Sequence, residues 1–172
     1  CLERFHQLYP QVHISIYNRT SSGSLELLRA GRIDAAFVNL PIDDDRITVH
    51  WEYPIQDIFV AGQKFSALKG KRLSAKELAA QPLILLEQKA NSRVYVQRFF
   101  LRKGVELNPE IELASYELMG ELARINLGIS CMVRQFCRRE LSEGKIFEVQ
   151  LADPIPPRSI GMVSLKGVSL PP

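Results

Sequence analysis

The stretch Thr20-Ser-Ser-Gly-Ser-Leu-Glu-Leu-Leu-Arg-Ala-Gly-Arg-Ile-Asp-Ala-Ala-Phe-Val-Asn39 decides the fold class of this chain. Its hydroxyl residues suit the start of a helix, and Gly31 suits the left-handed position that follows a helix end. Residues 35–38 are apolar without alternation, which is typical of a strand covered on both faces. Residues 12–17 alternate as a strand just upstream. The stretch therefore predicts a strand–helix–strand unit of an α/β domain with a parallel sheet.

A second unit of alternating strands and helices follows further along the chain. Ser74 with Glu77 forms a capping box, which predicts a short helix start. Residues 83–86 and 129–133 are apolar runs of strand length, and helices are predicted to begin at Asn91 or Ser92 and at Ser115 between them. Two more strands are predicted near residues 146–150 and 159–165, separated by a stiff proline-containing connector. These patterns predict a second α/β unit, and the chain ends in a strand.

The composition is that of an ordinary globular protein. Hydrophobic residues make up 46% and charged residues 24% of the 172 residues, so the chain can bury a substantial core. No apolar run is long enough to span a membrane, and no membrane partner is expected. The 22 basic and 19 acidic residues are dispersed and give a net charge of +3, which is too weak for a nucleic-acid footprint.

The cysteine count indicates a reducing compartment. Cys1, Cys131 and Cys137 make an odd number, which favours free thiols over a disulfide framework. Buried free cysteines commonly pack as small hydrophobic residues. A redox switch between Cys131 and Cys137 stays open as an alternative.

Catalytic and metal-binding patterns are absent from the sequence. His6, His13 and His50 have no metal-ligand spacing, and no hydrolase, nucleotide or dinucleotide motif occurs. Residues 43–45, three adjacent aspartates, are interpreted as a solvated turn because they cannot all face one cation. We therefore predict no catalytic residue, no metal and no cofactor.

Two polar helix starts follow predicted strands, where open α/β sheets bind their ligands. One carries Thr20, Ser21 and Ser22, and the other carries Asn91 and Ser92. Hydroxyl groups and free backbone N–H groups at a helix start favour small anions or carboxylates. Simple capping of the two helices would explain the same residue types.

Four stretches of the chain resemble the effector-binding domain of LysR-type transcriptional regulators. The likeness spans essentially all of the chain, and its most specific part is the second stretch. Asn126, in the fourth, stands where the family more often has Ala or Gly. The stretches are Phe5-His-Gln-Leu-Tyr-Pro-Gln-Val-His-Ile14, Leu27-Leu-Arg-Ala-Gly-Arg-Ile-Asp-Ala-Ala-Phe-Val38, Leu78-Ala-Ala-Gln-Pro-Leu-Ile84 and Leu122-Ala-Arg-Ile-Asn-Leu-Gly-Ile-Ser130.

The resemblance implies two Rossmann-like lobes joined by two crossover strands, as in the type 2 periplasmic binding proteins. Lobe I would comprise residues 1–61 plus 151–172, and lobe II residues 62–150, with the crossovers near Ala61 and Leu151. Lobe I is expected to lack the family's first strand and its last helix, which follows the region of residues 169–171. The family's DNA-binding winged helix-turn-helix is expected to be absent from this chain.

The resemblance also implies which residues contact the effector and which contact a second subunit. The first helix, with Leu2 and Phe5, would pack on the second lobe of a partner in a homodimer or tetramer. The effector, expected to be an anion or carboxylate, would lie in the cleft between the lobes. The predicted effector-binding residues are Thr20, Ser21, Ser22, Asn39, Leu40, Asn91 and Ser92.

The function implied is a cytoplasmic bacterial ligand sensor. Effector binding would shift the two lobes and the paired subunits, and tethered DNA-binding domains would report the change as altered transcription. DNA would be a partner only through the missing N-terminal domain. One alternative is a solute-binding protein of a transport system, and a third interpretation is an enzyme on the same two-lobed fold.

Overall fold

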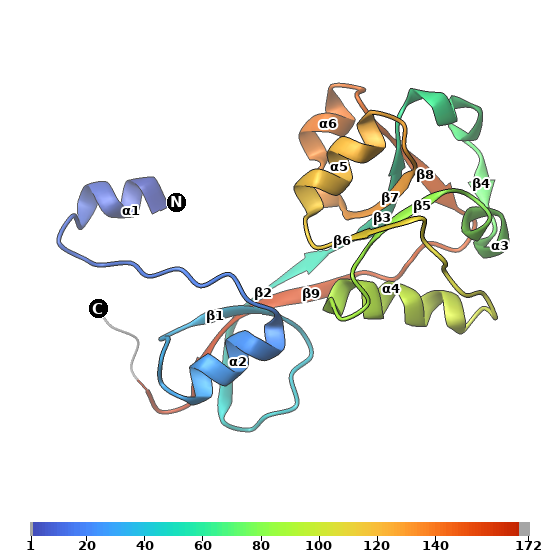
Figure 1. Ribbon diagram of the computed structural model, residues 1–172. Helices are drawn as coiled ribbons and strands as arrows, with labels where there is room; N and C mark the ends of the chain where they lie inside the picture. Colours follow the sequence, from blue (N-terminus) through green and yellow to red (C-terminus); the bar gives the residue numbers. More distant parts are fainter. Residues whose placement is uncertain (1, 169–172) are drawn as a thin grey trace.

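Two β-sheets form the two halves of the molecule in the computed structural model, which describes residues 2–168. Figure 1 shows the smaller sheet with helix α2 below and the larger sheet with its helices above. The predicted α/β fold is confirmed. Cys1 and residues 169–172, which end the predicted lobe I, lie outside the described residues.

The smaller sheet has three strands in the order β1-β9-β2, and both of its pairings are antiparallel. Helix α2 (Ser21–Arg29) buries Leu28 against Val38 and Val163 on one face of this sheet. Strand β9 lies in the middle, and β1 and β2 both form their backbone hydrogen bonds with it. The strands are β1 (Ala36–Asn39), β2 (Ile47–Ile55) and β9 (Arg158–Leu165).

The larger sheet has six strands and mixed directions. Strand β5 runs parallel to β6 and β7, whereas β3 is antiparallel to β7 and β8. In sheet order the strands are β4 (Arg72–Leu73), β8 (Phe147–Leu151), β3 (Asp57–Ala61), β7 (Ile129–Val133), β5 (Leu83–Leu86) and β6 (Ile111–Leu113).

Four α-helices and two short 3-10 helices pack around this larger sheet. Its main core cluster joins Phe59 of β3, Phe100 and Val96 on one helix, and Ile129 of β7. The α-helices are α3 (Ala75–Ala79), α4 (Asn91–Leu101), α5 (Tyr116–Arg124) and α6 (Arg138–Ser142), and the 3-10 helices are η1 (Gln63–Leu68) and η2 (Arg134–Phe136).

The chain passes between the sheets twice. Strand β2 continues almost directly into β3 across Gln56, and residues 152–157 lead from β8 back to β9. The Gln56 side chain donates a hydrogen bond to the Ile155 carbonyl at 2.7 Å and so ties the two connections together. The chain leaves the smaller sheet and enters the larger one at Gln56. Residues 57–61 therefore pair within the six-stranded sheet, although the sequence interpretation placed them in lobe I. The division into lobes of 1–61 plus 151–172 and 62–150 stays a prediction.

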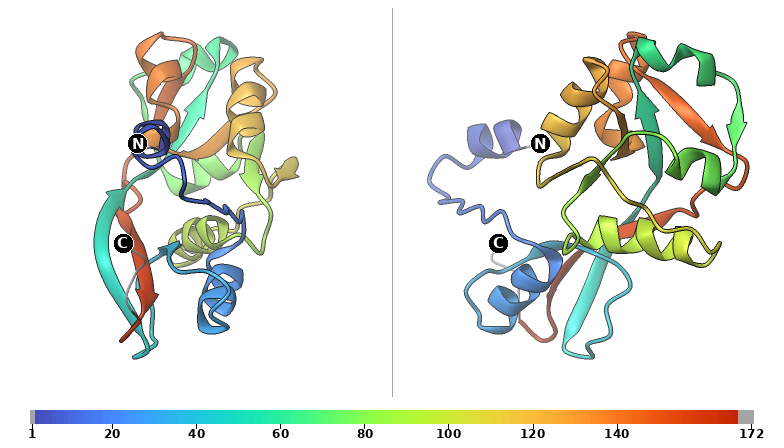
Figure 2. Two further views of the ribbon diagram at one scale, coloured as in Figure 1. Left: turned by 90° about the vertical axis from the view of Figure 1, so that its left-hand side faces the viewer. Right: turned by 45° about the vertical axis from the view of Figure 1, so that its right-hand side comes forward.

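The N-terminal segment lies away from both sheets (Figures 1 and 2). Helix α1 (Leu2–Leu8) has no buried residue. The predicted strand at residues 12–17 is wrong: these residues are exposed and form no strand in the structure. A strand needs a neighbour for its backbone hydrogen bonds, and alternation alone does not supply one. The prediction of a parallel sheet in the first unit is also wrong, because residues 12–17 do not supply a strand for it. The three-stranded sheet is antiparallel.

Local helix signals mostly act as predicted. Ser74 and Glu77 form the capping box, and hydrogen bonds from the Ser74 backbone and hydroxyl lower the pKa of Glu77. The N-cap of α4 is Ala90, with no side-chain hydrogen bond, rather than Asn91 or Ser92. The left-handed residue after α5 is Asn126, with φ of 69°. No helix among residues 2–168 is long and apolar enough to cross a membrane.

The acidic turn at residues 43–45 is not fully solvated. Asp44 accepts hydrogen bonds from Arg46 Nε at 3.0 Å and from Arg29 Nε at 2.8 Å, and its side chain is 8% exposed. The hydrogen bonds from Arg46, with a smaller contribution from Arg29, lower the pKa of Asp44. The predicted solvated turn is therefore wrong for Asp44, which anchors the end of α2 to the loop before β2.

Candidate functional site

A buried ion pair lies where the two sheets meet. Arg158 begins β9 and Asp57 begins β3, and their exposed fractions are 9% and 2%. Arg158 Nε donates to Asp57 Oδ2 at 2.6 Å, and Nη2 donates to Oδ1 at 3.0 Å. One edge of the guanidinium thus holds the carboxylate through two parallel hydrogen bonds, the strong bidentate arrangement.

The rest of the guanidinium links elements from both halves of the molecule. Arg158 Nη1 donates to Asn39 Oδ1, at the end of β1 in the smaller sheet. Nη2 donates to the hydroxyl oxygen of Ser92 at 2.8 Å, in the first turn of α4 beside the larger sheet. A single cation therefore joins polar side chains from both halves of the molecule.

The start of α2 holds the Asn39 side chain in place. Ser21 Oγ accepts hydrogen bonds from the backbone nitrogen and from Nδ2 of Asn39, both at 3.0 Å. Because the amide nitrogen faces Ser21, the amide oxygen faces Arg158, as a donor requires. The contact between the start of α2 and the end of β1 therefore fixes the Asn39 side chain, so that its amide oxygen faces the junction as an acceptor.

The charge of Arg158 is secured by its surroundings. Burial alone would lower the pKa of Arg158, but hydrogen bonds from its guanidinium to Asp57 and the charge of that carboxylate outweigh burial and raise it. The guanidinium also lies 5.8 Å from the centre of the Tyr95 ring, within cation–π range. Arg158 is therefore a permanent cation at the junction, neutralised by Asp57.

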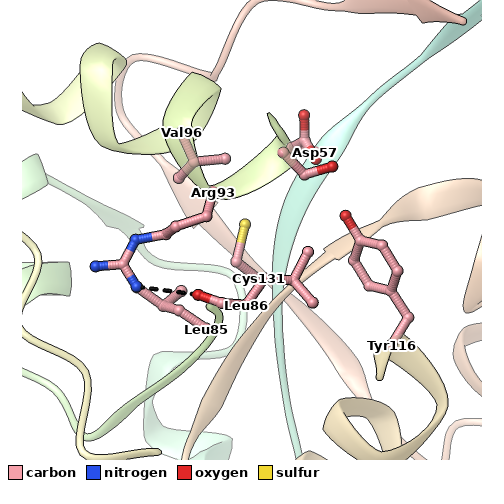
Figure 3. Close-up of a pocket in the computed structure, with 8 residues that line it drawn as sticks. Asp57, Leu85, Leu86, Arg93, Val96, Tyr116 and Cys131 are labelled. Atoms are coloured by element: carbon pink, nitrogen blue, oxygen red, sulfur yellow. Dashed lines mark hydrogen bonds between the residues drawn. The ribbon is translucent and has the colours of Figure 1, made fainter. Parts of the chain in front are cut away.

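A small cavity of about 10 Å³ adjoins the ion pair. Figure 3 shows the Tyr116 hydroxyl pointing toward Asp57, with Cys131 nearby and the Arg93 guanidinium turned away. Among residues 2–168 the Tyr116 hydroxyl has no partner in hydrogen-bond geometry, although Ser92 is close, and burial raises the pKa of Tyr116. A cavity of this size has room for about one water molecule.

A wider groove of about 500 Å³ lies on the smaller sheet's side of Arg158. A volume of this order is typical of a small-molecule site. Its walls are mostly apolar, and Glu52 adds one acidic side chain. The groove is lined by Leu40, Pro41, Ile42, Val49, Glu52, Tyr95, Pro157, Arg158 and Ser159.

The structure brings some of the predicted site residues together and not others. Ser21, Asn39 and Ser92 join in one hydrogen-bonded network through Arg158, and Leu40 lines the adjoining groove. Thr20 caps α2 by accepting from the Gly23 nitrogen at 3.3 Å. Two further predicted residues, Ser22 and Asn91, are exposed outside this network. Effector contact by any of the seven stays a prediction.

The sequence interpretation missed Asp57, Arg158 and Tyr116. Asp57 opens an otherwise apolar strand, and Arg158 follows Pro157 at the end of the connector, so each charge precedes a buried segment. A charged residue there requires a partner. The sequence does not show which residue that partner is, because the two lie 101 positions apart.

Metal-ligand clusters are also missing from the described part of the chain. Among residues 2–168 no three His, Cys, Asp or Glu side chains lie together as a potential metal site. His50, one of the three histidines, instead has Nε2 2.7 Å from the Ser164 hydroxyl.

The two described cysteines should be unreactive in the folded protein. Cys131 and Cys137 are both buried free thiols. Burial raises the pKa of Cys131 and raises that of Cys137 to about 11, so at pH 8 only about 0.1% of Cys137 is the reactive thiolate. In a Cys1→Ser variant, we expect Ellman's reagent to label neither thiol within minutes and both after unfolding in guanidinium. Rapid labelling of the native variant would revive the alternative of a redox switch.

The two sheets and their two connections define a two-lobed α/β domain with the type 2 periplasmic-binding-protein fold. Within that class, the chain belongs to the family of LysR substrate binding domains, whose sequence pattern matches residues 1–172. The resemblance stated from the sequence is confirmed.

Curated relatives are transcriptional regulators. The chain is 28% identical over 131 residues to the HTH-type transcriptional activator CmpR of Synechocystis, covering 76% of this chain and 43% of CmpR. It is 26% identical over 155 residues to the HTH-type transcriptional regulator YeiE of Escherichia coli, covering 90% of this chain and 52% of YeiE. The chain thus spans about half the length of these relatives.

Solved structures of similar domains contain small molecules. The regulatory domain of Synechocystis CcmR in complex with 2-PG matches with a TM-score of 0.84 at 20% identity, over 99% of this chain and 82% of that one. The effector-binding domain of QuiR with shikimate matches with a TM-score of 0.78 at 16% identity, over 99% and 81%. These matches establish the fold, and the bound molecules belong to those proteins.

Proposed function

We propose that this domain senses a small anionic effector at the junction of its two sheets and so controls DNA binding and transcription by a full-length regulator. The observation that carries this proposal is the Arg158 guanidinium, a buried cation that donates to Asn39 of one half and to Ser92 of the other. A ligand that competes for this guanidinium would break its hydrogen bonds to Asn39 and Ser92. The ligand would therefore make different contacts when the two halves are joined by these bonds and when they are not. Such a difference in affinity is what shifts a conformational equilibrium.

The kind of site supports a small organic anion. The apolar groove beside Arg158 can hold a ligand body, while the guanidinium holds its charge. The similar domains of CcmR and QuiR were solved with 2-PG and shikimate, and that of BenM with its effector benzoate. Ser21, Asn39, Leu40 and Ser92 are proposed as contacts, and Thr20, Ser22 and Asn91 as residues at the rim.

The wider biological setting is part of the same proposal. We place the regulator in the cytoplasm as a homodimer or tetramer without catalytic activity, with DNA bound by a separate winged helix-turn-helix domain. Leu2 and Phe5 on α1, which are 57% and 37% exposed, are the proposed contacts with a second subunit. The family and the regulatory relatives favour this role over a solute-binding protein for transport.

The test measures ligand binding by the full-length protein. Calorimetric titration with benzoate, shikimate, sulfate and 2-PG should find at least one ligand. A double variant, Asp57→Ala with Arg158→Met, should bind that ligand about 100-fold more weakly because the charged contact is lost, without leaving one buried charge unpaired. Arg134→Met serves as the control, since Arg134 pairs with Glu148 on the larger sheet. Equal ligand affinity of the wild type and the double variant would show that Arg158 is not part of the binding site.

A further inference from the structure

The Arg158 guanidinium has two edges that can each hold a pair of oxygen atoms. Its five N–H donors form a planar fork, and bidentate carboxylate binding uses two neighbouring nitrogens of such a fork. The Nε and Nη2 edge holds both oxygens of Asp57. The outer edge, Nη1 and Nη2, holds two oxygens from different residues, one from Asn39 and one from Ser92.

We propose that this outer edge of Arg158 is the carboxylate subsite of the effector, and that Asn39 and Ser92 hold it in the ligand-free protein. The inference rests on the proposed function and names the chemical class that the site takes. Two neutral oxygens on separate elements accept the Nη1 and Nη2 hydrogen bonds that the two oxygens of one carboxylate could accept together. A carboxylate adds the attraction of its own charge to the two hydrogen bonds, so a ligand whose body also gains contacts in the groove displaces the pair.

The displaced side chains keep hydrogen-bond partners, which lowers the cost of the exchange. The Asn39 amide remains bound to Ser21 through Nδ2. The Ser92 hydroxyl lies close to the buried Tyr116 hydroxyl, which has no other partner among the described residues, so a small rotation joins the two. Ligand binding thereby converts a bridge between β1 and α4 into separate contacts within each half of the molecule.

The charges around the subsite favour a monocarboxylate. Asp57 already neutralises Arg158, so a bound monoanion leaves one net negative charge at the junction and a dianion leaves two. Glu52 lines the adjoining groove and adds to the repulsion. With like charges disfavoured at short range, an apolar monocarboxylate fits the groove and the fork better than a dicarboxylate.

The decisive experiment removes the protein acceptors from the outer edge of Arg158 and adds formate, the smallest carboxylate. The variant without these acceptors is called the open variant. In an Asn39→Ala, Ser92→Ala variant of the full-length protein, both outer N–H donors lose their protein acceptors. We expect sodium formate at about 100 mM to raise the melting temperature of this variant by about 3 °C relative to sodium chloride at the same concentration. Wild type should show less than about 1 °C, since Asn39 and Ser92 compete for the fork.

Two further variants keep the test decisive. Ser92→Ala alone retains the Asn39 contact and should show a smaller formate effect, so a double variant that fails to fold does not end the test. Adding Asp57→Ala and Arg158→Met to the open variant should abolish the effect. Ser66→Ala, an exposed hydroxyl in η1, is the matched control and should behave as wild type.

The possible results separate this inference from the proposed function. Equal melting temperatures in formate and chloride for the open variants overturn the carboxylate subsite, even if the effector titrations succeed. A formate effect that depends on Arg158 supports the subsite, even if none of the four titrated ligands binds wild type. An equal formate effect in the Ser66→Ala control would show a general salt effect and would also overturn the inference.

Discussion

Replacing Asp57 by Ala should destabilise the protein by about 3–5 kcal/mol, because it leaves the buried Arg158 cation without its counter-ion. Arg158 and Asp57 are 9% and 2% exposed, so water cannot solvate the remaining charge without local opening. The hydrogen bonds to Asn39 and Ser92 remain but involve neutral acceptors. Urea denaturation followed by circular dichroism measures the loss as a shift of the unfolding midpoint.

Two controls separate the buried charge from the loss of any ion pair. Glu148→Gln removes the partner of Arg134, which is 42% exposed, and should cost at most about 1 kcal/mol. The double variant Asp57→Ala with Arg158→Met should recover part of the stability, because removing both charges leaves neither one unpaired. A double variant less stable than Asp57→Ala alone would show that the cation is held by something other than Asp57.

Replacing Phe100 by Ala should also cost about 3–5 kcal/mol. Phe100 is completely buried in the core of the larger sheet, where its ring meets Phe59 edge-on at 5.7 Å and Phe99 at 5.4 Å. The substitution removes the packing that holds α4 against β3. Since α4 carries Ser92 and β3 carries Asp57, weaker effector binding is expected together with the lower stability.

The neighbouring residue supplies the control for this prediction. Leu101 is 53% exposed at the end of α4, so Leu101→Ala should change the unfolding free energy by less than about 1 kcal/mol. Chemical denaturation of both variants compares them under one condition. Similar losses at the two positions would contradict the packing of α4 through Phe100.

Prediction from the sequence succeeded where the signal was local. The buried strands near residues 35–39, 83–86 and 129–133 stand within a residue or two of where the apolar runs place them. Ser74 and Ser115 cap their helices through hydrogen bonds made within three residues. Such features depend on the chain's own neighbours, so a short window contains their physical cause.

Part of the candidate site could be predicted for the same reason. Ser21 and Ser92 were placed by the rule that ligands bind at helix starts beyond strand ends, and Asn39 was placed by the family resemblance. The structure joins the three in one network. The strand predicted at residues 12–17 failed, although its alternation is clear. Alternation describes the side chains of a strand, but its hydrogen bonds come from a neighbour elsewhere in the chain.

The sequence by itself determined the family, the α/β class, the helix starts and the buried strands of this protein. Only the tertiary structure decided that Arg158 pairs with Asp57 and that its guanidinium also donates to Asn39 and Ser92. These residues come from four elements in both halves of the molecule. A buried charge requires a partner, but the partner's identity depends on which backbone segments cross nearby. That crossing is set by the packing of the whole chain.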